Sequence, residues 1–121
     1  MNTTLLELQQ EFIREVLRCV QVEEWDRIEI HYEFYVWEGV DLEQSTSNSF
    51  VGDVRTDLDL SFDAIELAFA MRNAKPDGQA EHWTSMDFRI DSTGKFSFDY
   101  GYGLPPMAAR TIAAQPPARG R

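Results

Sequence analysis

The segment around His31 holds the clearest candidates for chemistry in this sequence. His31 lies two residues from Glu29 and two residues from Glu33, so the three side chains share one face if the segment is an extended strand. Flanking carboxylates favour the protonated imidazole, and histidine is the most frequent general base in enzymes. The sequence marks no serine or cysteine nucleophile to accompany it. We therefore interpret His31 as a surface or interface histidine and not as a catalytic base.

An acidic run further along the chain has the rhythm of a metal-binding loop. Four oxygen-bearing residues occupy alternate positions, as the first ligands of a calcium loop do: Asp57, Asp59, Ser61 and Asp63. Such a loop needs glycine at its sixth position for a sharp bend and glutamate at its twelfth for two ligands, and here Phe62 and Ala68 stand there. We interpret the run as solvated side chains and helix capping. We expect no metal ion, no cofactor and no catalytic residue in the chain.

The composition favours one acidic domain that binds neither nucleic acid nor membranes. Of the 121 residues, 43% are hydrophobic, and 21 Asp and Glu against 11 Lys and Arg give a net charge of −10. Proteins that bind phosphate backbones use basic patches, and no apolar stretch is long enough to span a bilayer. The lone cysteine, Cys19, excludes an intramolecular disulfide, and no secretory signal is visible. We therefore expect a cytoplasmic protein.

The distribution of charge divides the chain near residue 103. All acidic residues lie at or before Asp99, whereas the charged residues of segment 104–121 are Arg110, Arg119 and Arg121. This last segment also has two Pro-Pro pairs and no helical or strand periodicity. We therefore predict a single α+β domain over residues 1–103 and a flexible, basic, Pro/Ala-rich tail over residues 104–121.

Apolar periodicity predicts six elements in the order α-β-β-α-β-β. Thr4 followed by Glu7 is a capping-box pattern at the start of the first helix. The elements are a helix over residues 4–21, a strand over 27–38, a loop over 39–48, a strand over 49–56, a helix over 61–74, and strands over 83–91 and 95–102. Short connections imply antiparallel pairing. We predict an α+β fold in which two helices cover one face of an antiparallel sheet of about four strands.

The strand over 27–38 alternates so regularly that its two faces differ in chemistry. Apolar side chains such as Ile28 and Ile30 belong to one face, and acidic or aromatic side chains belong to the other. A negative surface accelerates association with a basic partner, and Tyr and Trp often anchor interfaces. The residues that we predict to bind a partner lie on this second face or among the acidic residues elsewhere: Glu29, His31, Glu33, Tyr35, Trp37, Asp53, Asp57, Asp59 and Asp99.

The last two predicted strands carry a recognisable pattern. Residues 83–91 read WTSMDFRID and residues 94–102 read GKFSFDYGY. A Trp before an apolar strand, a Gly-Lys-Phe turn exit and an Asp-Tyr-x-Tyr ending resemble the terminal hairpin of the YezG-like immunity (antitoxin) family of bacterial polymorphic toxin systems. The order of the preceding elements is similar as well, with Trp25 opening the long aromatic strand.

The resemblance implies an immunity protein and not an enzyme. Proteins of this family are made beside a secreted or contact-delivered toxin, often a nuclease, and protect the producer by binding the toxic domain. The partner implied here is a cognate, basic toxin domain. Two alternatives stay open: an acidic protein-interaction adaptor, and a small ligand-binding domain or enzyme that uses the aromatic strand face as a pocket.

Overall fold

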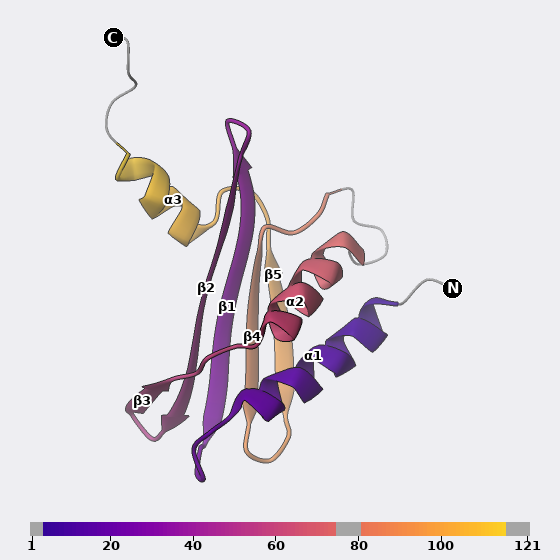
Figure 1. Cartoon of the computed structure of the whole chain (residues 1–121), viewed down its shortest axis with the longest axis vertical. Coiled ribbons are helices and arrows are strands. Elements are labelled where there is room, and N and C mark those ends of the chain that lie inside the picture. Colours follow the sequence, from indigo (N-terminus) through magenta and orange to yellow (C-terminus); the bar gives the residue numbers. More distant parts are fainter. Residues whose placement is uncertain (1–3, 75–80, 116–121) are drawn as a thin grey trace.

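A five-stranded antiparallel sheet forms the centre of the protein (Figure 1). The computed structural model describes residues 4–74 and 81–115. The spatial order of the strands is β3-β2-β1-β4-β5. Their bounds are β1 Arg27–Trp37, β2 Val40–Val51, β3 Val54–Asp57, β4 Ser85–Asp91 and β5 Phe96–Gly101. The predicted α+β class and antiparallel pairing are confirmed, although the sheet has five strands and not about four.

The extra strand comes from a segment that the sequence predicts to be a loop. Residues 40–48 are mostly polar, but they belong to β2, and β1 pairs with β2 along the whole length of β1. The turn between the two strands is only Glu38 and Gly39, both with positive φ, as tight hairpins require. A second tight turn, at Gly52 and Asp53, divides the strand predicted over 49–56 between the end of β2 and β3, so that prediction of one continuous strand is wrong. The prediction of a loop over 39–48 is therefore wrong, because pairing with a neighbouring strand outweighs a polar composition.

Two helices, α1 (Leu5–Cys19) and α2 (Phe62–Ala74), pack on one face of the sheet, as predicted (Figure 1). The capping box is also confirmed, since the Thr4 hydroxyl accepts the N–H of Glu7 at 3.1 Å and the Glu7 carboxylate accepts the N–H of Thr4 at 3.0 Å. Between the helices and the sheet, Phe12 meets Phe88 edge to face at 5.3 Å. Trp83 is fully buried in the same core. No helix within the described residues is long and apolar enough to cross a membrane.

A third helix, α3 (Pro106–Ala113), corrects the expectation of two helices. It lies within segment 104–121, where we predict no regular structure, and Figure 1 shows it on the opposite side of the sheet from α1 and α2. It packs over β1 and β2, and the Gln44 side chain bonds the Thr111 hydroxyl at 3.0 Å. Residues 116–121 of the predicted tail lie outside the described residues. The second sheet face is thus covered over one half and open over the other.

Candidate functional site

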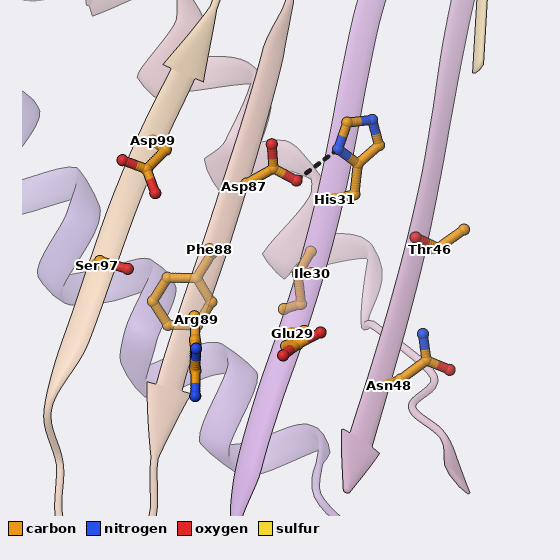
Figure 2. A pocket seen from close by; sticks show the side chains of 10 residues that line it. All are labelled: Glu29, Ile30, His31, Thr46, Asn48, Asp87, Phe88, Arg89, Ser97 and Asp99. Carbon is orange, nitrogen blue, oxygen red and sulfur yellow. Dashed lines mark hydrogen bonds and ion pairs between the residues drawn. The ribbon is translucent and has the colours of Figure 1, made fainter. Parts of the chain in front are cut away.

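The open half of the second sheet face contains a shallow hollow of about 350 Å³, which we call the central hollow. Its side chains come from β1, β2, β4 and β5, which are neighbours in the sheet, and Figure 2 shows α1 and α2 behind the sheet. The residues that line it are Glu29, Ile30, His31, Thr46, Asn48, Asp87, Phe88, Arg89, Ser97 and Asp99. Polar side chains of this kind gather there because alternation along each strand sends the apolar neighbours to the core.

His31 is held between two carboxylates at the upper edge of the hollow. Its Nδ1 lies 2.7 Å from Oδ1 of Asp87, and its Nε2 lies 2.5 Å from Oε2 of Glu33. The imidazolium form can donate to both oxygens, whereas either neutral tautomer can donate to only one. Burial lowers the pKa of His31, but the hydrogen bonds and charges of Glu33 and Asp87 outweigh it, so the pKa lies above the ordinary value of 6.5.

Glu33 does not lie on an exposed surface, contrary to our expectation. Its side chain is fully buried, because α3 covers it. Its two carboxylate oxygens accept the N–H groups of Met107 and Ala108, both at 2.8 Å. The N-cap residue of α3, Pro105, makes no side-chain capping bond. Glu33 therefore supplies the cap and the negative charge that a helix N-terminus favours, and it is not available to a partner in this structure.

The exposed charges around the hollow are predominantly acidic. Three carboxylates, on Glu29, Asp87 and Asp99, line it together with one guanidinium, on Arg89. Asp87 and Asp99 lie directly opposite each other on β4 and β5, and both are exposed. Like charges in directly opposed positions of a sheet destabilise the pairing. Glu29 is partly neutralised, because its carboxylate accepts the Nε–H of Arg27 at 2.8 Å.

The structure brings together some of the predicted binding residues and separates others. Glu29, His31 and Asp99 all line the central hollow. Asp57 lies beside it, since it pairs with Asn48 across β2 and β3. The other five residues lie outside the hollow. Glu33 is buried under α3, Tyr35 and Trp37 are half-buried near the β1–β2 turn, and Asp53 and Asp59 are exposed, in the β2–β3 turn and just after β3.

Asp87 and Arg89 are absent from the predicted set although both line the hollow. The sequence indicates which face of the sheet they occupy, because they alternate with the apolar residues Met86, Phe88 and Ile90 of one strand. The sequence does not indicate which strand lies next to this one in the sheet. β4 pairs with β1 over residues far apart in the chain, and this register places Asp87 opposite His31.

This arrangement suits binding better than proton transfer. Both ring nitrogens of His31 are engaged by carboxylates, which leaves no lone pair directed at a substrate. Within residues 4–74 and 81–115, no group of three or more His, Cys, Asp or Glu side chains is arranged to hold a metal ion. A comparison of the sequence with protein-family models and with curated proteins finds no match in either.

Proposed function

We propose that this protein is an immunity protein that binds and neutralises a cognate toxin domain through the central hollow and the carboxylates around it. The toxin is secreted or delivered by contact, and the immunity protein acts in the cytoplasm of the producing cell. The observation that carries the proposal is the direct opposition of Asp87 and Asp99 on an open sheet face. The resemblance of residues 83–102 to the terminal hairpin of YezG-like immunity proteins adds the biological role.

The charge arrangement supports a basic partner. Asp87 is partly compensated by its bond to His31, whereas Asp99 has no ion-pair partner among the described residues. The remaining repulsion between the two carboxylates is relieved when a Lys or Arg of a partner binds. Glu29, on β1 opposite Arg89 of β4, also lines the hollow and extends the negative surface to β1. A surface of this kind also raises the association rate with a positively charged protein, with the strongest effect at low ionic strength. Nuclease domains are often basic, because they grip phosphate backbones.

The rigidity of the site supports the proposal as well. His31 is fixed by Asp87 on one side and by Glu33 on the other, and Glu33 is itself fixed by two backbone N–H groups of α3. The recognition surface is therefore ordered before a partner arrives. Pre-ordered side chains lose less conformational entropy on association, which increases affinity.

The test is a calorimetric titration of the protein with the toxin domain encoded by the adjacent gene. We expect a stable complex, and we expect Asp99→Lys to weaken it by about tenfold or more, because the variant places a cation in the acidic surface. The matched control is Glu11→Lys, which changes the net charge equally on α1, across the sheet from the hollow. Absence of a complex would reject the immunity role, and equal effects of the two variants would reject the hollow as its interface.

The volume of the hollow supports a second candidate function, the binding of a small ligand. A volume of about 350 Å³ falls in the range of small-molecule sites. Those sites are mostly apolar, whereas polar and charged side chains dominate the lining here. A thermal-shift screen against metabolites in the absence of toxin separates the two functions, since only a ligand-binding domain would be stabilised.

A further inference from the structure

The outer edge of β2 is unpaired along much of its length within the described residues. β3 pairs only with the last part of β2, from Asn48 to Val51. Beyond this pairing, the carbonyl of Ser47 still accepts the N–H of Leu58 at 3.0 Å, which shows that the backbone groups of Ser47 point outward. Because successive residues of a strand alternate in direction, the N–H and C=O groups of Asp41, Glu43 and Ser45 point outward too. These groups form an open template for another strand.

An apolar groove lies beside this open edge, on the side of the sheet that carries α2. We call it the edge groove; it has a volume of about 340 Å³ and is lined by Phe34, Glu43, Phe62, Ile65, Glu66 and Phe69. Phe62 exposes 74% of its surface. Burial of so exposed a phenyl ring under a partner contributes favourable free energy to binding. Exposed apolar surface next to an unpaired strand is the arrangement that binds extended peptides, because the edge provides backbone bonds and the groove takes alternate side chains.

The floor of the edge groove is already well packed, so the groove keeps its shape without an occupant. The rings of Phe34 and Phe69 meet at 5.1 Å. The guanidinium of Arg72 lies 4.5 Å from the centre of the Phe34 ring, and its Nε–H bonds the carbonyl of Trp83 at 3.0 Å. Arg72 is thus engaged by the protein itself. The Glu43 carboxylate accepts the hydroxyl of Tyr32, a neutral donor that leaves its charge in place, so Glu43 and Glu66 set the charge of the opening.

The charges at the rim select the occupant. A second copy of the chain would pair its β2 edge with this one and bring Asp41 and Glu43 of both copies together, which costs free energy through like-charge repulsion. A strand that presents Lys or Arg meets Glu43 and Glu66 with complementary charge instead. Apolar side chains on the same face of that strand, between the basic ones, cover Phe62 and Ile65.

We propose that the open edge of β2 and the edge groove bind an extended segment of another protein that presents both apolar and basic side chains on the face that meets the groove. The segment adds to the sheet as a further strand antiparallel or parallel to β2. This site lies on the α2 side of the sheet and does not include the central hollow, so the proposal goes beyond the function proposed above. Its test uses no toxin, and the two proposals can therefore fail separately.

The experiment is a titration of the full-length, isotope-labelled protein, followed by amide chemical shifts. The probe is an acetylated and amidated peptide of about seven residues in which Lys and Val take turns at the odd positions and Ser fills the even ones, so that Lys and Val share one face. We expect saturable shifts at the amides of Asp41, Glu43 and Ser45, with a dissociation constant of about 1 mM or lower. We expect the same peptide with Glu in place of Lys to bind at least about tenfold more weakly, because its carboxylates face Glu43 and Glu66.

Two variants test the groove without threatening the fold. Phe62→Ser removes an exposed ring and is expected to weaken the Lys-Val peptide about fivefold. Val54→Ser is the matched control, because Val54 is an apolar residue of similar exposure on β3 and outside the groove; it should leave the affinity unchanged. Shifts that map away from β2, equal binding of the acidic peptide, or a β2-mediated dimer of the protein alone would each overturn the proposal.

Discussion

Oε1 of Glu33 accepts the backbone N–H of Ala108 at 2.8 Å, between two fully buried residues that lie 75 positions apart in the chain. This bond, with its counterpart to Met107, fixes the N-terminus of α3 on the centre of the sheet. The position of α3 decides which half of the second sheet face is covered and which half remains as the central hollow. The stability of the protein and the shape of its candidate binding surface therefore depend on the same carboxylate.

Replacing that carboxylate should loosen α3. We expect Glu33→Gln to lower the free energy of unfolding by about 2–4 kcal/mol, because an amide leaves one N–H of α3 or the imidazole of His31 without a matching acceptor. Urea denaturation measures the loss, and hydrogen exchange should show faster exchange at the amides of Met107 and Ala108. The control Glu29→Gln changes a partly exposed pair and should cost less than about 1 kcal/mol. A loss no larger than that of the control would contradict the capping role.

The stability of the protein should depend on pH through His31. Its folded-state pKa is raised above the ordinary value of 6.5, so its contribution is complete below pH 6.5 and is lost as the pH rises through the folded-state pKa. We expect the free energy of unfolding of the wild type to fall over this window relative to His31→Gln. Urea denaturation of both proteins at several pH values measures the difference. Any contribution of His82 to the pH dependence is the same in both proteins and cancels in that difference. Parallel pH profiles would rule out the raised pKa.

Removing one carboxylate from the opposed pair should stabilise the protein and weaken its binding. We expect Asp99→Asn to raise the free energy of unfolding by about 0.5 kcal/mol, because it ends the repulsion from Asp87 across the two strands. The same variant should lower the affinity for a basic toxin domain, as measured by calorimetry. Ser97→Asn, at the neighbouring position of β5 on the same face, provides a control that leaves the charge unchanged. A destabilised Asp99→Asn protein would show that the pair is not repulsive.

Association with the toxin domain should be sensitive to salt. If the carboxylates of the hollow attract a basic partner, the association rate falls as ionic strength rises, whereas the dissociation rate changes little. Stopped-flow measurements at several salt concentrations test this expectation. The salt dependence should be shallower for Asp99→Lys than for the wild type. Equal slopes for the two proteins would exclude a contribution of Asp99 to the attraction.

Local patterns in the sequence were sufficient for much of the fold. The capping box at Thr4 and Glu7 lies within one helical turn, so the start of α1 could be recognised directly. The alternation of β1 separates Ile28 and Ile30 from Glu29 and His31 in any sheet that buries one face. These predictions succeeded because the interacting groups are neighbours along the chain.

The tertiary structure alone decided where α3 forms and which side chains His31 meets. Segment 106–113 has no local N-cap, since Pro105 has no polar side chain, and its capping groups come from Glu33 in a distant strand. Likewise, Asp87 reaches His31 only because β4 pairs with β1 in one register. Periodicity along the chain reports which face a side chain occupies, whereas strand order and helix docking depend on the free energy of contacts between distant segments.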